Sequence, residues 1–226
     1  MSVSKLMVKT AELYNCELEH LKPLFNDSVY PWDILPRIKV VIKELLEKGI
    51  EGYHLLEDGI LVGENVKIAK TATIEAPAII GHNTELRPGA FLRGNVIIGE
   101  NCVIGNSSEL KNSILLNKVQ VPHYNYVGDS ILGNFAHMGA GSILSNLKSD
   151  GKNVVIHGDK EYETGLRKIG AFLGEHADIG CGSVLNPGTI IGNNTSVYPL
   201  SMLRGVYPSD SIVKKIDLVV EKTKGE

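Results

Sequence analysis

The amino-acid sequence predicts a mainly β protein, a solenoid of stacked parallel strands whose coils are built from six-residue repeats. Three observations support this fold class. An aliphatic residue recurs at every sixth position over long stretches, the chain of 226 residues contains 24 glycines where ordinary usage gives about 16, and aromatic residues make up only 6% of the chain. Such a composition favours close turns around a thin aliphatic core.

The repeat runs through most of the chain. Every sixth residue from Val62 to Leu116 is Val, Ile or Leu, and the same holds from Leu173 to Leu203; a shorter run reads Leu132, Met138, Leu144. A helix would need a period of 3.6 and an ordinary half-buried strand a period of 2. Three hexapeptides close a triangular coil of about 18 residues with one side chain per face pointing inward.

The repeat loses register twice. The first gap lies between Leu116 and Leu132 and contains the stretch VPHYNYVGDS. The second lies between Leu144 and Leu173 and is polar and charged. An insertion of this size in a solenoid predicts a protruding loop at about residues 145–168, of the kind that carries function.

Both ends of the chain differ from the repeat. Residues 38–46 carry apolar side chains at helical spacing before Gly49, so we expect residues 1–60 to form a helical cap over the open N-terminal end of the solenoid. The β-helix itself is expected over residues 61–206. Residues 207–226 are charged and predict a tail that packs back as a short helix or strand, or frays.

Composition argues against several function classes. The net charge of -3 provides no electrostatic footprint for binding nucleic acid, and no apolar run approaches the ~18–20 residues that a bilayer requires. The three cysteines, Cys16, Cys102 and Cys181, match neither a disulfide framework nor a zinc motif. These features predict a reduced, soluble, cytoplasmic protein without a metal site.

His123 is the strongest candidate for a catalytic residue. It lies among polar and aromatic residues in VPHYNYVGDS, and histidine can act as a general base near neutral pH. The alternative is a surface or interface histidine that only makes hydrogen bonds.

Three segments carry a resemblance to a known family: ELK at 109–111, PHYNYVGDS at 122–130 and GAGSILSN at 139–146. They resemble the acetyltransferase half of the bifunctional uridyltransferase/acetyltransferases that make UDP-N-acetylglucosamine, and still more the archaeal sugar-1-phosphate nucleotidylyltransferase/acetyltransferases. The resemblance covers roughly residues 62–206. It implies a left-handed β-helix, a homotrimer with sites between neighbouring solenoids, and acetyl-CoA as co-substrate without a metal.

The resemblance implies roles for individual residues. His123 falls on the family's general base, which takes a proton from the sugar's 2-amino group as that amine attacks the thioester of acetyl-CoA. Arg93 and Lys111 fall on the residues that bind the sugar phosphate. They are 18 residues apart, one coil, which suits a dianion, although a solvated charged edge is the alternative.

Further substrate contacts are implied for Tyr126 and Asn146, and Asp129 belongs to the same motif as a substrate or loop-fixing residue. His137 stands where the family has a sugar-contacting asparagine, a departure that leaves the identity of the sugar open. For the cofactor, Ala140 falls at a backbone contact, and Cys181 replaces a family serine.

Lys152 is one of the basic residues of the loop at 145–168 that would meet the phosphates of the cofactor. The alternative is a solvated loop in which acids balance the bases. The family's nucleotidyltransferase domain has no counterpart in residues 1–60, so we do not expect nucleotidyl transfer.

Two other functions remain open at the level of sequence. A non-catalytic β-helix that binds a nucleotide-sugar or acyl-CoA would shift its melting temperature with acetyl-CoA without turnover. A γ-class carbonic anhydrase would need three histidines on zinc, typically two of them five residues apart, and none of the seven histidines are five apart.

Overall fold

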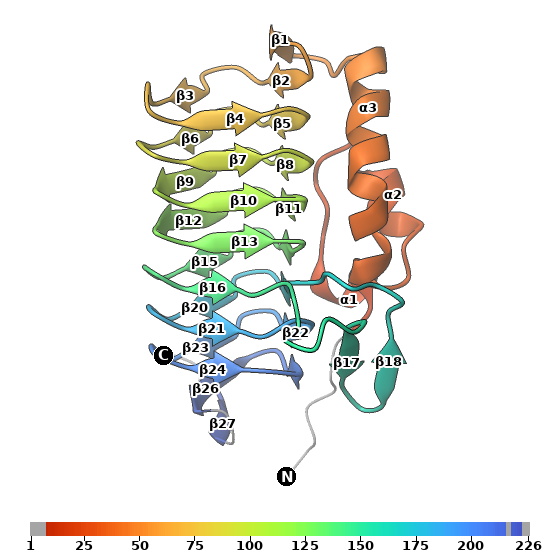
Figure 1. The fold of residues 1–226 in the computed structure, drawn as a ribbon, viewed down its shortest axis with the longest axis vertical. Helices are drawn as coiled ribbons and strands as arrows, with labels where there is room; N and C mark the ends of the chain where they lie inside the picture. Colours follow the sequence, from red (N-terminus) through yellow and green to blue (C-terminus); the bar gives the residue numbers. More distant parts are fainter. Residues whose placement is uncertain (1–7, 216–217, 223–226) are drawn as a thin grey trace.

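The computed structural model describes residues 8–215 and 218–222 and confirms the predicted fold class. It is a parallel β-solenoid of about nine turns, consistent with a left-handed β-helix (Figure 1). Each coil contributes one short strand to each of three sheets, here called A, B and C. One aliphatic side chain per strand, such as Ile80, Leu86 and Leu92, points into the solenoid core.

The strands of each sheet stack in register along the solenoid axis. Sheet A contains β1 (His54–Glu57), β2 (Ile60–Val62), β5 (Ala78–Ile80), β8 (Val96–Ile98), β11 (Ser113–Leu115), β14 (Ile131–Leu132), β19 (Ala171–Leu173), β22 (Thr189–Ile191) and β25 (Val206–Tyr207). Sheet B contains β3 (Lys67–Ile68), β6 (Glu85–Leu86), β9 (Val103–Asn106), β12 (Gln120–His123), β15 (His137–Met138), β20 (Asp178–Ile179), β23 (Ser196–Val197), β26 (Ser211–Lys215) and β27 (Leu218–Glu221). Sheet C contains β4 (Thr73–Glu75), β7 (Phe91–Arg93), β10 (Glu109–Lys111), β13 (Tyr126–Gly128), β16 (Ile143–Leu144), β21 (Val184–Leu185) and β24 (Met202–Leu203).

The first loss of register begins earlier than predicted. A single residue, Asn112 and then Asp129, turns the chain from sheet C to sheet A in two successive coils, with φ of +46° and +48°. These coils are one residue shorter, so Leu115 and not Leu116 points into the solenoid core; Leu116 belongs to a second apolar cluster. A single short-chain residue suits this corner because Asn and Asp tolerate the left-handed region.

The N-terminal helices lie along the side of the solenoid, which corrects the predicted cap over its open end (Figure 1). The predicted helix is present and ends before Gly49. The helices are α1 (Thr10–Leu13), α2 (Lys22–Asn26), η1 (Pro31–Asp33), η2 (Leu35–Arg37) and α3 (Ile38–Lys48). They pack on outward-facing apolar residues of sheet A, including Ile79, Ile97 and Phe172. At the open end, β1 instead pairs antiparallel with β2.

The insertion after β16 folds back instead of protruding freely. It forms an antiparallel hairpin of β17 (Val155–His157) and β18 (Glu161–Glu163). Ile156 is fully buried in the apolar cluster of the helices, and the Tyr162 ring lies edge-on to Tyr30 and Trp32. At the other end, β26 pairs with β23 and β27 returns antiparallel, so the described part of the tail packs back as strands. The domain boundaries themselves stay predictions.

Candidate functional site

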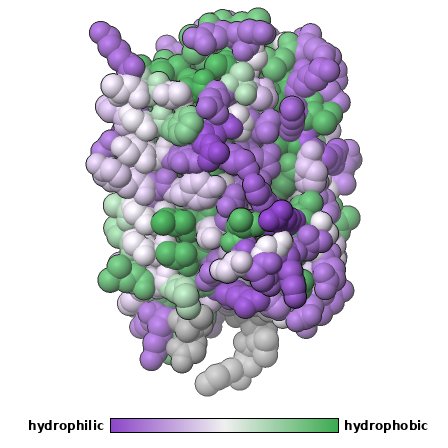
Figure 2. Space-filling view, in the orientation of Figure 1, coloured by the Kyte–Doolittle hydropathy of each residue, from purple (hydrophilic) through white to green (hydrophobic). Residues whose placement is uncertain are grey.

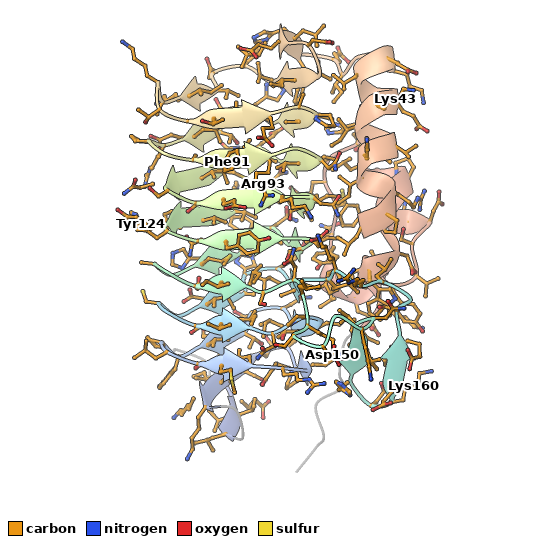
Figure 3. The ribbon with its side chains drawn as sticks, viewed as in Figure 1. Lys43, Phe91, Arg93, Tyr124, Asp150 and Lys160 are labelled. Atoms are coloured by element: carbon orange, nitrogen blue, oxygen red, sulfur yellow. The ribbon has the colours of Figure 1, made fainter. Side chains whose placement is uncertain are left out.

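The outer face of sheet C carries the predicted phosphate-binding residues in one column (Figure 3). The strand register places Arg93 beside Glu75 of the preceding coil and Lys111 beside Gly128 of the following one, so Arg93 and Lys111 are stacked as their spacing predicts. Arg93 donates to Glu109 at 2.6 Å, and this hydrogen bond raises the pKa of the guanidinium. Both groups are partly exposed, so an anion can reach them.

Asp129 joins this column to Asn146. Its carboxylate is only 5% exposed and accepts hydrogen bonds from Lys111 Nζ at 3.5 Å, Asn112 Nδ2 at 2.9 Å and Asn146 Nδ2 at 2.5 Å. A buried carboxylate requires such donors, since an unpaired buried charge is costly. Lys111 and Asn146 are therefore held by the same anion.

Tyr126 completes the cluster. It lies between Glu109 and Ile143 in the outward column of sheet C. Burial raises the pKa of Tyr126, and the negative charges of Glu109 and Asp129 raise it further, while a hydrogen bond from Asn146 acts in the opposite direction. The phenol stays neutral at physiological pH and can offer a hydroxyl and a ring face to a polar ligand.

His123 lies at the corner where sheet B turns into sheet C. His123, Ala140 and Cys181 occupy equivalent corners of successive coils, because Gly141 N donates to His123 O at 3.0 Å and Gly182 N to Ala140 O at 2.9 Å. All three are exposed, and adjacent coils lie about 4.8 Å apart.

The corner at His123 is rigid. The buried Asn125 side chain accepts from His123 N at 3.0 Å and donates to Gly139 O at 2.8 Å in the next coil. Asn125 also donates to the backbone oxygen and hydroxyl of Ser142. This bracing fixes the backbone that carries the exposed imidazole.

The corner column and the phosphate column lie at opposite edges of sheet C. Figure 3 shows Tyr124, the neighbour of His123, at one edge and Arg93 at the other. Tyr126 lies on the strand that connects the two edges. A ligand that contacts both must cross the face of sheet C over Tyr126.

Two predicted residues are not joined to this cluster by the described contacts. His137 lies on sheet B, where its Nδ1 is 2.8 Å from Asp178 Oδ1, and this hydrogen bond lowers the pKa of Asp178. Lys152 is exposed on the insertion, with its backbone N–H donating to Asp150. Within one protomer the structure thus brings together the residues of sheet C and its two edges, but not His137 or Lys152.

Sequence reasoning missed the partner of Arg93 and the central place of Asp129. Glu109 lies in the quoted ELK segment, two residues from Lys111, and one coil from Arg93. Asn112, Asp129 and Asn146 are each 17 residues apart, which is the coil length here. A search at 17 as well as 18 residues would have placed them in one column.

Among residues 8–215 and 218–222, no group of three or more His, Cys, Asp or Glu side chains is arranged to hold a metal ion. No helix in the same ranges has the length and apolar character needed to cross a membrane.

Comparison with known proteins gives similarity to sugar-modifying enzymes. A family model described as the GMPPB C-terminal domain matches residues 74–161. The bifunctional protein GlmU of Methanococcus aeolicus is 34% identical over 211 residues, covering 90% of this chain and 50% of that protein. The chain spans about half the length of such curated relatives, and the match covers their C-terminal acetyltransferase half.

A relative of similar size is an uncharacterised acetyltransferase, YaiX, of Escherichia coli O6:K15:H31, 30% identical over 161 residues, which are 71% of this chain and 70% of the relative. Among solved structures, a mutant of AntD, an N-acyltransferase from Bacillus cereus, in complex with dTDP and coenzyme A, gives a TM-score of 0.45 at 20% identity, covering 77% of this chain and 92% of that one.

Proposed function

Because the chain belongs to the hexapeptide-repeat acyltransferase family, we propose that it is an acetyl-CoA-dependent N-acetyltransferase acting on an amino-sugar 1-phosphate. One observation carries the proposal. Arg93, Lys111, Tyr126 and Asn146 form a connected polar cluster on sheet C, and an exposed histidine stands on a braced corner at the edge of the same face. This arrangement suits an anionic, hydroxylated acceptor better than an apolar one.

The reaction is a direct transfer. His123 takes a proton from the acceptor's amino group, the amine nitrogen forms a bond to the thioester carbonyl carbon, and the C–S bond of acetyl-CoA breaks. The coenzyme A thiolate leaves with the bonding pair and is protonated. Arg93 and Lys111 hold the phosphate, while the sugar ring lies over Tyr126. Fixing both reactants in this way supplies most of the rate enhancement.

Acetyl-CoA is proposed to follow the corner column. Ala140 and Cys181 are small, exposed residues on the two coils after His123, so they leave room for a thioester beside the imidazole. Lys152 on the insertion is proposed to meet the coenzyme phosphates.

We further propose a homotrimer in which His137 on sheet B of one copy approaches sheet C of its neighbour. Support comes from the faces of the solenoid: helices cover sheet A, whereas sheets B and C present exposed side chains. Hydrophobic residues stand among polar ones on the face of sheet C (Figure 2), and Leu200 and Met202 are 84% and 61% exposed. Sedimentation equilibrium should give three times the mass of one chain; a monomer would refute this part.

The test of the function is release of coenzyme A thiol from acetyl-CoA. Glucosamine-1-phosphate and galactosamine-1-phosphate are offered beside the same amino sugars without phosphate. We expect turnover with a phosphorylated acceptor and a loss of at least about tenfold in His123→Ala. Equal turnover in His123→Ala would remove the assigned base. A thermal shift with acetyl-CoA but no thiol release with any acceptor would instead support a non-catalytic binding protein.

A further inference from the structure

The orientation of the Asn146 amide follows from its neighbours. A carboxylate has no hydrogen to donate, so the 2.5 Å contact to Asp129 Oδ2 must be made by the NH₂ group of Asn146. The same NH₂ group donates to the Tyr126 hydroxyl. With both amide hydrogens directed to these partners, only the carbonyl oxygen Oδ1 remains for a ligand.

Asp129 is itself held from several sides. Its backbone N donates to Lys111 O at 2.9 Å, and its backbone O accepts from Gly170 N at 2.8 Å. Asn146 O accepts from Ile169 N at 3.1 Å, so the end of the insertion is fixed to both residues. The corner conformation at φ +48° and the bond from Asn112 leave the carboxylate one orientation.

Gly128 makes the close approach of Tyr126 and Asn146 possible. A Cβ at this position would lie 2.6 Å from Tyr126 Oη and 2.7 Å from Asn146 Nδ2. Those atoms are the ends of side chains, so alanine here displaces the two side chains before it disturbs the backbone.

We propose that Asp129 is a positioning residue that fixes Asn146 with its carbonyl oxygen toward the acceptor amine. This inference rests on the proposed function. An acceptor-only group can receive an N–H of the attacking amine and orient its lone pair, but it cannot stabilise the oxyanion of the thioester carbon, which needs a donor. Asp129 holds Lys111 by the same carboxylate.

The kinetic test compares Asp129→Asn, Asn146→Ala and the double variant. Asp129→Asn should lower kcat roughly ten- to hundredfold, as misplacement of a catalytic contact does. The KM for the phosphorylated acceptor should not rise, because Lys111 loses an anionic competitor. In the Asn146→Ala background, Asp129→Asn should have little further effect on kcat, because the two residues act as one unit. Multiplied effects, or a kcat within about twofold of wild type in Asp129→Asn, would overturn the proposal.

Asp210→Asn is the matched control for local geometry. Asp210 also turns a corner with φ of +53° and accepts from an asparagine one coil away, Asn194 Nδ2 at 2.8 Å, but it lies outside the cluster. This variant should retain wild-type kcat. An equal loss of kcat in Asp210→Asn would assign the effect of Asp129 to folding and overturn the proposal.

A readout without turnover separates this proposal from the proposed function. In ¹⁵N-labelled full-length protein, the side-chain amide of Asn146, identified by its loss in Asn146→Ala, should exchange with solvent more slowly than that of exposed Asn153, and Asp129→Asn or Gly128→Ala should abolish the difference. Equal exchange of Asn146 and Asn153 in wild type would overturn the fixed amide. Slow exchange without turnover on any acceptor would refute the proposed function and leave the fixed amide standing.

Discussion

At the scale of residues, the site is electrically balanced before any ligand binds. Arg93 is paired with Glu109 at 2.6 Å and Lys111 with Asp129 at 3.5 Å. The two pairs differ in accessibility, since Glu109 is partly exposed while Asp129 is buried. A phosphate therefore competes with Glu109 for Arg93 but joins Lys111 without displacing Asp129.

This competition gives a prediction in which a substitution strengthens binding. Glu109→Gln should lower the KM for a phosphorylated acceptor several-fold, because about 1 kcal/mol of competing interaction is removed. Lys111→Met should raise the same KM. Steady-state kinetics with phosphorylated and unphosphorylated acceptors check this, since neither variant should change KM for the latter. An unchanged KM in Glu109→Gln would place the phosphate elsewhere.

At the scale of elements, the helices, the insertion and sheet A share one apolar cluster. Trp32 is at its centre, stacked on Tyr30 and in contact with Tyr162 of the insertion and Phe172 of β19. Sequence indicated this poorly, because a helix over a sheet face leaves only a continuous apolar strand as its signal. Strands such as Ala78–Ile80 and Val96–Ile98 carry that signal, apolar at every position.

Truncating Trp32 tests the role of this cluster. Trp32 is 4% exposed, and Trp32→Ala should reduce the free energy of unfolding by about 3–5 kcal/mol through lost burial and a cavity. Urea unfolding measures the change. Val29→Ala, at a side chain that is 59% exposed, should change stability by less than about 0.5 kcal/mol. A loss below about 1 kcal/mol in Trp32→Ala would show that the helices contribute little to stability.

The contact between the helical segment and the solenoid near the N-terminal end is predicted to weaken in acid. His20 and His82 pack on opposite sides of Tyr53, with ring centroids 5.9 and 4.7 Å from it. Burial lowers the pKa of His20, and the nearby His82 lowers it further. The unfolded state, with a histidine pKa of about 6.5, then binds protons more readily than the folded state.

Stability from this group is complete above about pH 6.5 and is lost as the pH falls toward the folded pKa. Urea unfolding at pH 7.5 and pH 5.0 should therefore show a smaller loss of stability in His20→Gln than in wild type. The same loss in both proteins would mean that other groups control the acid response.

At the scale of the whole molecule, the sequence period was sufficient for the solenoid but not for what surrounds it. A six-residue repeat specifies which side chain of each strand points inward, and Arg93 and Lys111 follow from one-coil arithmetic. The corners at Asn112 and Asp129 each remove one residue, so the contacts of Asp129 required the actual register. His137 lies on another face, where one chain alone cannot show its ligand.

A structure with coenzyme A bound tests the central claim most directly. The account predicts that the thiol ends beside the imidazole of His123, over the corner of Ala140 and within reach of Asn146. A thiol bound on another face, remote from His123 in every copy of the assembly, would contradict it.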